Sequence, residues 1–557
     1  MPTIEVNYND LQELVGTHVP LDKLQEEGIM FAKGEVDEID GEILKLDMKD
    51  TNRPDLWSAE GIARELQGRY GEAKGVPRYK TKKSDLRVIV DPGMKSIRPY
   101  TVCAVVKDLH ITPDVLSQMI QLQEKLSITF GRNRSEVAVG AYDYHKIKPP
   151  IRFMPVAPDG LRFAPLGFSE EMTPAKILKK HPKGLEYGHL LKGMKKYPIF
   201  IDADDNVLSM PPIINSDHTG KVTTSTRDIF IESSGFDLKF QLPALNVLVS
   251  ALADRGGTVE TVEVSYPDRK LVTPDMNPRK TSVNADYANS VTGLGLTVKE
   301  MCSLLEKARY TAAPKGKKID LLYPCYRQDI MHQRDVIEDI LISYGFNSIK
   351  PSPPGIVTRG GMSGMARLSE AAAESMIGLG FQEIMSYILT NKDHLFRRMN
   401  TGEADVVEIE NRVSANWYVF RNWMLPSLLD FLSRNRHREY PQMIFETGET
   451  VLPDREAETR SVSPVKLAAA VSAHSVGYEK ITSVLDAFLS GFGVKYSLET
   501  SGHGSFIKGR RADVVSGKAV LGTVGEIHPV VLNNWELENP VAAFELDLGK
   551  LMKILEK

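Results

Sequence analysis

The spacing of hydrophobic residues changes repeatedly along the chain between the period of an α-helix and that of a β-strand. Apolar residues three and four positions apart predict helices over 58–68, 112–126, 244–256, 297–308, 334–346, 365–380 and 481–491. Runs rich in β-branched and aromatic residues predict strands over 86–91, 100–109, 381–390, 442–452 and 466–474, and a strand followed by a turn over 318–330. This mixture favours an α+β protein.

The length of the chain and two interruptions of the pattern predict several domains. A chain of 557 residues exceeds the size at which one hydrophobic core keeps growing, so roughly three to five domains are expected. The connectors "YPDRKLVTPDMNPRK" and "KPSPPGIVTRGGMSG" are rich in proline, glycine and charge. We therefore expect an N-terminal domain (1–85), a strand-rich domain (86–268), a small mixed module (269–350) and a C-terminal α+β domain (351–557). No internal repeat is evident.

Composition excludes some classes of protein but selects none. The net charge of -4 neither implies nor rules out RNA binding. An RNA partner would have to bind to local basic patches. Three cysteines, far apart, are too few for a disulfide framework or a zinc site built on thiolates. No signal peptide precedes the first domain and no apolar run approaches the ~18 residues of a membrane span. A cytoplasmic protein that does not enter the membrane is expected.

Four carboxylates gather in the stretch "YRQDIMHQRDVIEDI". In a helix that begins near Asp335, the side chains of Asp335, Glu338 and Asp339 share one face, and Asp329 lies just before it. Acidic residues in a first turn also interact favourably with the helix dipole, by roughly 0.3 to 1 kcal/mol each. The alternative is a hard divalent cation, and because no zinc-type pattern of histidines and cysteines accompanies these carboxylates, Mg²⁺ is favoured over zinc. Spacing alone leaves both interpretations open.

Four stretches in the same order resemble the phenylalanyl-tRNA synthetase beta-subunit family in its archaeal and eukaryotic form. They are the carboxylate stretch above, "TNRPDLWSAEGIAREL", "VLSMPPIINSDHTG", and "FRNWMLPSLLDFLSRN" with "MIFETGETV" and "GTVGEIHPVVLNNW". The resemblance covers essentially the whole chain. It implies an α2β2 tetramer in the cytoplasm, in which the alpha subunit uses ATP to charge tRNA(Phe) and the beta subunit supplies tRNA contacts, assembly and hydrolytic editing. It also implies that Asp329, Asp335, Glu338 and Asp339 bind Mg²⁺.

The C-terminal domain is expected to be a class II synthetase-like antiparallel sheet without catalytic motifs. It offers Arg421 and, in a predicted strand, Glu446, but no arginine follows the late glycines of "GTVGEIHP". Adenylate formation should therefore belong to the alpha subunit. By comparison with bacterial members of the family, an anticodon-binding domain is not expected after this domain.

The family resemblance places an editing pocket at "LSMPPIINSD" and "TTSTRDIFIESSGFD". The first segment contributes Ser209, Asn215 and Ser216 beside an extended Pro-Pro backbone. The second contributes Thr226, Glu232 and Asp237. Polar groups in such a pocket would hold the hydroxyl of tyrosine and penalise phenylalanine. A plain polar turn after a Pro-Pro bend is the alternative.

Seven lysines between residues 176 and 196 could contact the phosphates of a tRNA acceptor end, although a run of charge is more often a solvated face. Two other functions remain open at this stage. One is a stand-alone Mg²⁺-dependent hydrolase built on the four carboxylates. The other is a scaffold for RNA or protein without catalytic activity.

Overall fold

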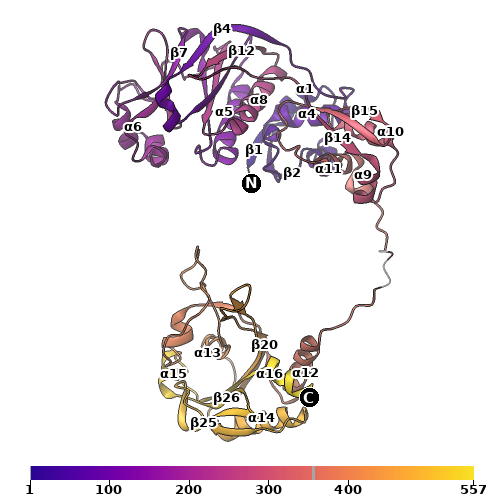
Figure 1. The fold of residues 1–557 in the computed structure, drawn as a ribbon, viewed down its shortest axis with the longest axis vertical. Helices are drawn as coiled ribbons and strands as arrows, with labels where there is room; N and C mark the ends of the chain where they lie inside the picture. Colours follow the sequence, from indigo (N-terminus) through magenta and orange to yellow (C-terminus); the bar gives the residue numbers. More distant parts are fainter. Residues whose placement is uncertain (1, 354, 356–357, 557) are drawn as a thin grey trace. The chain divides into compact units, whose positions relative to one another are not determined.

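The computed structural model describes residues 2–353, 355 and 358–556, and the chain forms two compact units, Met1–Pro353 and Pro354–Lys557 (Figure 1). The division falls within the predicted connector at 350–364. Three separate sheets follow one another along the first unit. The finer boundaries near residues 85 and 268 stay predictions. No helix in the described part of the chain combines the length and hydropathy that crossing a bilayer requires.

The first module pairs a small antiparallel sheet with one well-buried helix. Strands β1 (Thr3–Asn7), β2 (Gly34–Asp40) and β3 (Ile43–Met48) take the order β1-β3-β2. Helices α1 (Tyr8–Val15), α2 (Leu21–Lys23), α3 (Ile29–Phe31) and α4 (Ala59–Tyr70) accompany them. Helix α4 begins where the sequence predicts, because the Ser58 side chain accepts the backbone N–H of Gly61.

A ten-stranded mixed sheet forms the largest part of the first unit. Its strands are β4 (Thr81–Val90), β5 (Tyr100–Lys107), β6 (Val137–Asp143), β7 (Ile151–Val156), β8 (Tyr197–Ile201), β9 (Val207–Met210), β10 (Ile214–Asn215), β11 (Ile229–Gly235), β12 (Thr258–Ser265) and β13 (Lys270–Thr273). The order is β10-β9-β8-β7-β4-β12-β5-β11-β6, with β13 beside β12. Only the β4–β12 and β4–β7 pairs are parallel.

The two faces of this sheet pack against different cores. Helix α8 (Leu238–Asp254) packs on β5 and β11 and shares a core with Val102, Ala104 and Val106. Because successive strand residues point to opposite faces, Cys103 and Val105 belong to a second core, together with Tyr142. Helices α5 (Pro113–Lys125), α6 (Pro174–Lys180) and α7 (Pro182–Tyr187) complete the domain.

The third module repeats the plan of the first. Strands β14 (Arg279–Asn284), β15 (Thr311–Lys315) and β16 (Lys318–Tyr323) form a sheet of order β14-β16-β15, with helices α9 (Ala285–Thr292), α10 (Val298–Lys307) and α11 (Gln333–Tyr344). The predicted capping box of Thr297 and Glu300 is present at α10. An Arg-x-Asp turn precedes α11 as it precedes α4, and both helices end at Tyr-Gly. The likeness is one of strand order and turn geometry. The sequence shows no evident repeat, because few residue types besides these are shared.

The second unit is a seven-stranded sheet covered by helices on both faces. Its order is β17-β20-β23-β27-β26-β25-β24, with β17 (Gln382–Glu383), β20 (Gln442–Glu449), β23 (Val465–Ser472), β24 (Ser497–Thr500), β25 (Phe506–Ser516), β26 (Ala519–Ile527) and β27 (Val541–Asp547). Short strands β18 (Leu389–Thr390) with β19 (Val419–Phe420), and β21 (Leu452–Pro453) with β22 (Ser461–Val462), form two small ribbons. The β17–β20 pair is parallel. The sheet is thus mixed and not wholly antiparallel as expected, whereas the α+β class is confirmed.

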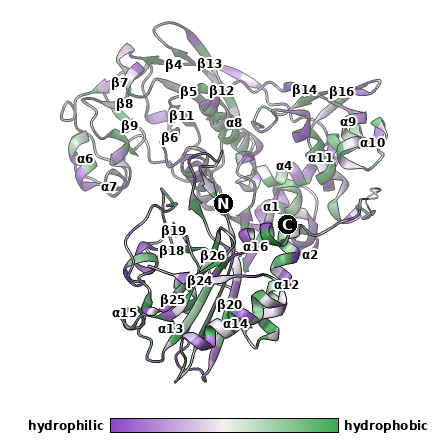
Figure 2. Ribbon diagram, turned by 60° about the horizontal axis from the view of Figure 1, so that its bottom comes forward, coloured by the Kyte–Doolittle hydropathy of each residue, from purple (hydrophilic) through white to green (hydrophobic). Residues whose placement is uncertain are grey.

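The helices of the second unit divide between the two faces of its sheet. Helices α12 (Gly364–Gly378), α14 (Tyr478–Gly491) and α16 (Leu548–Leu555) contribute to one core. Helices α13 (Leu425–Arg434) and α15 (Pro529–Asn534) contribute to the other. Figure 2 shows hydrophobic residues concentrated along the central strands, as expected for a sheet buried on both faces.

Candidate functional site

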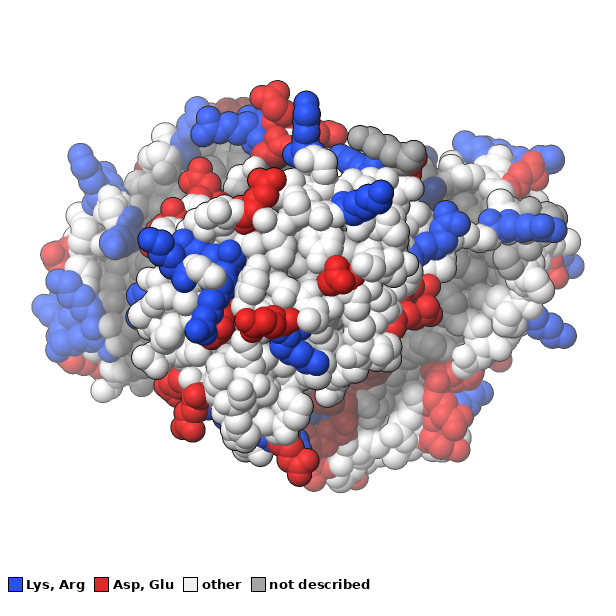
Figure 3. Space-filling model, turned by 90° about the horizontal axis from the view of Figure 1, so that it is seen from below, with Lys and Arg blue, Asp and Glu red and all other residues white. Residues whose placement is uncertain are grey.

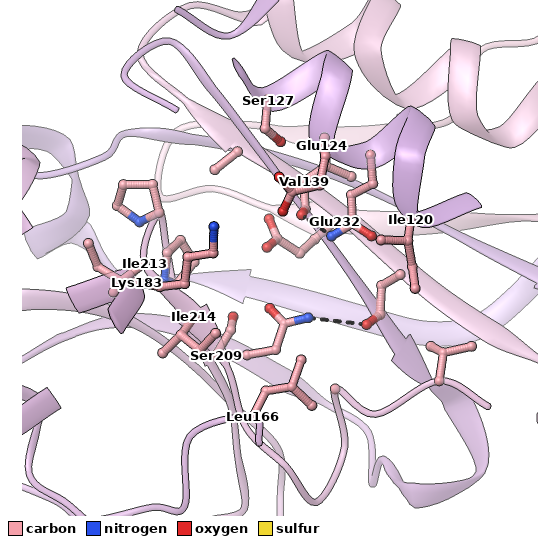
Figure 4. Close-up of a pocket in the computed structure, with 18 of the residues that line it drawn as sticks. Ile120, Glu124, Ser127, Val139, Leu166, Lys183, Ser209, Ile213, Ile214 and Glu232 are labelled. Carbon is pink, nitrogen blue, oxygen red and sulfur yellow. Dashed lines mark hydrogen bonds between the residues drawn. The ribbon is translucent and has the colours of Figure 1, made fainter. Parts of the chain in front are cut away.

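A cavity of about 360 Å³ lies in the ten-stranded sheet, where its two edge strands β6 and β10 approach each other (Figure 4). The amide of Asn215, on β10, donates from Nδ2 to the carbonyl oxygen of Ala141, on β6, over 3.3 Å. Side chains from α5 line a third side. A cavity of this size is in the range that encloses a small ligand.

The segment after β9 builds one wall of the cavity. Ser209 pairs with Asn215 across the β9–β10 hairpin, and Pro211 to Ile214 line the cavity between them. A Cβ at Gly220 would lie 2.3 Å from the Cβ of Asn215, so only glycine leaves that side chain in place. The predicted segment "LSMPPIIN" is therefore part of a cavity and not only a solvent-exposed turn.

A buried polar chain crosses from this wall to the centre of the sheet. The Tyr142 hydroxyl, on β6, lies 2.7 Å from Ser209 Oγ and 3.1 Å from Glu232 Oε1, on β11. All three side chains are buried, and Ser209 and Glu232 line the cavity. Burial raises the pKa of Glu232 to about 7, although Arg98 and the nearby hydroxyls of Tyr142 and Ser234 act to lower it. The other carboxyl oxygen, Oε2, is buried and has no hydrogen-bond partner among the described residues.

Ser216, Thr226 and Asp237 lie outside the cavity lining. The buried Ser216 hydroxyl pairs with that of Thr219 at 2.9 Å, and Thr226 Oγ1 contacts Asp143 at 3.4 Å. Asp237 is half-buried and caps α8 by accepting the backbone N–H of Lys239. Of the sequence-derived pocket residues, the structure brings together Ser209, Asn215 and Glu232.

Charged residues that sequence analysis did not assign to the pocket line the cavity beside α5 and α7, although Lys183 is one of the seven lysines predicted as possible phosphate contacts. Arg134 donates to the carbonyl oxygens of Pro212 and Ile213 at 3.2 and 3.0 Å, and to Glu124 at 3.1 Å. Lys183, at the start of α7, also lines the cavity and pairs with Glu186 at 3.1 Å. Tyr142 was likewise missed. Only the closure of the sheet brings these residues to Ser209, so local spacing gives no signal for them.

The structure does not gather the four predicted metal ligands around one point. Both oxygens of Asp329 accept from Arg327, which also donates to Asp339 at 2.9 Å. Glu338 pairs with Lys33 at 2.9 Å, and Asp335 accepts the backbone N–H groups of Met331 and His332. Burial would raise the pKa of Asp329, but Arg327 outweighs this effect and the pKa falls to about 2.

These carboxylates are thus a poor fit to Mg²⁺ as they stand. Within the described ranges, no group of three or more His, Cys, Asp or Glu side chains is placed to hold a metal ion. A magnesium site here stays a prediction of the sequence.

In the second unit, Arg421 and Glu446 neutralise each other. Arg421 Nη1 lies 2.9 Å from Glu446 Oε1, both side chains are buried, and Nε donates to the carbonyl oxygen of Glu449. An arginine held in this way is not available for a nucleotide phosphate. That this domain lacks a catalytic set stays a prediction.

Comparison with known proteins identifies the family. Family models match the chain at residues 349–548 (phenylalanyl tRNA synthetase beta chain CLM domain), 281–346 (tRNA synthetase B5 domain) and 106–245 (B3/4 domain). The phenylalanine–tRNA ligase beta subunit of Pyrococcus abyssi is 48% identical over 556 residues, which cover 99% of this chain and 100% of that protein. The beta subunit of Pyrococcus horikoshii is 46% identical over 557 residues, with 99% and 100% coverage.

A solved structure agrees with these matches. The crystal structure of an N-terminal fragment of the phenylalanyl-tRNA synthetase beta subunit from Pyrococcus horikoshii covers 62% of this chain and 100% of the fragment, with 48% identity and a TM-score of 0.60. The cavity between β6 and β10 falls largely within the B3/4 match, and α11 falls within the B5 match. The chain belongs to the family of phenylalanine–tRNA ligase beta subunits, in its archaeal form.

Proposed function

We propose that the cavity between β6 and β10 is an editing site, which hydrolyses tRNA(Phe) that carries tyrosine. The single observation that supports this function best is Glu232, a cavity-lining residue whose buried Oε2 has no hydrogen-bond partner among the described residues. A buried polar atom without a hydrogen bond costs about 1–3 kcal/mol, and a ligand hydroxyl would remove that cost.

Tyrosine and phenylalanine differ by one hydroxyl group, and this difference determines what an editing site must do. A hydrophobic aminoacylation pocket discriminates by only about 10²-fold against an amino acid that carries one added hydroxyl. A site built to hydrogen-bond that hydroxyl discriminates against the analogue lacking it by about 10⁴ to 10⁵. Glu232 supplies the acceptor, and Ile120, Val139 and Ile213 supply an apolar surrounding for a side chain (Figure 4).

The remaining polar residues have positioning roles in this proposal. Asn215 and Ser209 lie on the wall opposite α5, where the ester and the attacking water would be held. Tyr142 fixes the Glu232 carboxyl through Oε1, which leaves Oε2 for the ligand. Ser216 and Asp237 act indirectly, through the turn after β10 and the start of α8.

The partners follow from the family. We propose an α2β2 complex in the cytoplasm, in which the alpha subunit uses ATP to charge tRNA(Phe) and this chain binds the same tRNA. The buried Arg421–Glu446 pair supports a non-catalytic second unit. The native mass of the complex after co-expression with an alpha subunit tests the assembly.

The test of the editing function compares two substrates. In Glu232→Ala, kcat/KM for deacylation of Tyr-tRNA(Phe) should fall about 10- to 100-fold, the equivalent of one hydrogen bond to a charged group. The slow deacylation of Phe-tRNA(Phe) should change little. Glu171→Ala, which replaces an exposed carboxylate of the same domain, is the matched control.

Two other outcomes would contradict parts of the proposal. An equal fall for both substrates would assign Glu232 to the hydrolytic step instead of recognition. Unchanged rates for both substrates would show that the cavity is not the editing site, and would favour a scaffold without catalytic activity. A phosphoester hydrolase that depends on Asp335 would require activity from carboxylates that are already paired with protein groups.

A further inference from the structure

Two Arg-x-Asp turns in the first unit have the same internal geometry. Arg53 donates from Nε and Nη2 to the two carboxyl oxygens of Asp55, over 2.9 and 2.8 Å. Arg327 does the same to Asp329, over 2.7 and 2.6 Å. Each arginine therefore occupies both oxygens of the aspartate two residues after it. Such bidentate pairs are among the strongest hydrogen-bonded ion pairs in proteins.

Each arginine also reaches an acidic residue on the helix that follows its turn. Arg53 Nη2 lies 2.8 Å from Glu65 Oε1 on α4, and Arg327 Nη2 lies 2.9 Å from Asp339 Oδ2 on α11. The separation along the chain is 12 residues in both cases. The carboxylate stretch that resembles a magnesium signature is thus one of two copies of the same arrangement.

The two copies face each other across the boundary between the first and third modules. Arg53 Nε lies 4.0 Å from Asp329 Oδ1, and Gln328 donates to the carbonyl oxygen of Asn52 at 2.6 Å. Arg69, at the end of α4, contacts Ser343 at the end of α11. The side chains of both arginines are only 2% exposed, so these charges are screened very little by water or salt.

A metal ion would compete with these contacts instead of adding to them. Mg²⁺ prefers an octahedron of oxygen ligands at about 2.0–2.1 Å, several of them water. Asp329 has no oxygen outside the Arg327 fork, and Asp339 Oδ2 also accepts from Tyr310 at 2.6 Å. Binding Mg²⁺ at these oxygens would leave the Arg327 guanidinium buried without its partners, which is costly.

We propose that Asp329 and Asp339, with Arg53, Asp55, Glu65 and Arg327, form a metal-independent arginine–carboxylate lock that joins the first and third modules. In this lock Arg327 supplies the positive charge that the family resemblance assigns to Mg²⁺. Asp335 and Glu338 are outside the lock. Asp335 caps α11, and Glu338 forms a more exposed pair with Lys33.

The two interpretations rank the same substitutions differently. If the four carboxylates bind magnesium, Glu338→Gln should lower Tm as much as Asp339→Asn, and replacing Arg327 should have little effect. The lock makes Arg327→Met and Asp339→Asn damaging and Glu338→Gln mild. Arg334→Met on the same helix, where the arginine is exposed, controls for loss of a surface charge.

The experiment is thermal unfolding of the full chain after exhaustive dialysis against EDTA, followed by titration with MgCl₂. We expect EDTA and Mg²⁺ to leave the Tm of the native chain unchanged. Arg327→Met and Asp339→Asn should lower it by about 5 °C, the effect of breaking a buried ion pair in a unit of this size. Glu338→Gln and Arg334→Met should lower it by less than about 1 °C.

Two results would overturn the lock. One is a saturable rise of Tm with Mg²⁺ that Asp329→Asn abolishes. The other is an equal loss of Tm in Glu338→Gln and Asp339→Asn. If Arg327→Met fails to fold, the metal dependence of the native chain and the Asp339→Asn to Glu338→Gln comparison still decide the question.

Discussion

Glu232 carries a buried carboxyl group whose ionisation opposes folding at neutral pH. Burial raises its pKa from an ordinary value of 4.5 to about 7. Below pH about 4.5 the group is protonated in both the folded and unfolded chain, so the full stability is present. As the pH rises through 7, the unfolded chain holds a solvated carboxylate and the folded chain must bury one. Stability is therefore lost between these limits.

Glu232→Gln should remove this loss, because glutamine stays neutral at every pH. We expect the variant and the native chain to have nearly equal Tm at pH 5. At pH 8 the variant should be more stable by roughly 3 kcal/mol at most, or a few degrees of Tm. Thermal scans at both pH values measure the difference, with Glu171→Gln as control. A difference of the same size at pH 5 and pH 8 would contradict the raised pKa.

The family resemblance located part of the candidate site. The segments around Ser209, Asn215 and Glu232 were identified from the family resemblance, and the structure places all three at one cavity. Asp237 was selected from the same segment as Glu232, but it caps α8 instead. The alternation of side chains along a strand explains why Glu232 points toward Tyr142, since Phe230 and Glu232 lie on the face of β11 that Tyr142 also contacts. Tyr142 could not be predicted, because its contact with Ser209 spans 67 residues.

At the scale of elements, the site depends on strand β6, which closes one side of the cavity. Gly140 on β6 lies opposite Glu232 in the ladder with β11. A Cβ at this position would lie 2.2 Å from the Tyr142 hydroxyl and 2.7 Å from Glu232 Oε1. Both distances are too short for a real contact, so a side chain here must displace the polar chain that positions Glu232.

Gly140→Ala should therefore weaken both editing and the fold. We expect kcat/KM for Tyr-tRNA(Phe) to fall by about tenfold, and the free energy of unfolding to fall by about 1–3 kcal/mol, the usual cost of overpacking. Adding Tyr142→Phe removes the nearest atom and should recover much of the Tm but not the discrimination. Gly378→Ala, where nothing lies within 4 Å of the new Cβ, is the control. Native discrimination in a folded Gly140→Ala would contradict the positioning role of Tyr142.

The main helices were largely predictable, whereas the pairing of strands was not. Helix α4 was expected over 58–68 and occupies Ala59–Tyr70, because Ser58 gives a clear start signal. The expected strand at 381–390 is mostly irregular, with only β17 and β18 at its ends. The repeated Arg-x-Asp turns escaped detection because they share only a few residue types at equal spacing, and only the hydrogen bonds show that these residues are equivalent.

On the scale of the whole molecule, binding of tRNA must depend on local charge. The net charge is -4, and Figure 3 shows lysine and arginine side chains interspersed with acidic ones on the face drawn. The segment that includes α6 and α7 is different. Lys176 and Lys183 pair with nearby glutamates, but no ion pair within the described residues involves the exposed lysines Lys179, Lys180, Lys192, Lys195 and Lys196.

Replacing Lys192, Lys195 and Lys196 together by glutamine should weaken tRNA binding in a manner that depends on salt. Each lost phosphate contact reduces the slope of log K against log [salt] by about 0.7 to 1. The combined change should be about 2 to 3 if all three lysines contact the backbone. The slope is measured on the complex co-expressed with the alpha subunit, and its native mass should not change.

A matched variant separates tRNA contact from general loss of positive charge. Lys315, Lys317 and Lys318 are equally exposed, but each pairs with an aspartate of its own module. Their replacement by glutamine removes the same formal charge and should leave the slope nearly unchanged. Because long-range attraction depends on total charge and direct contact depends on position, equal slopes in the two triple variants would show that these lysines form only a solvated face.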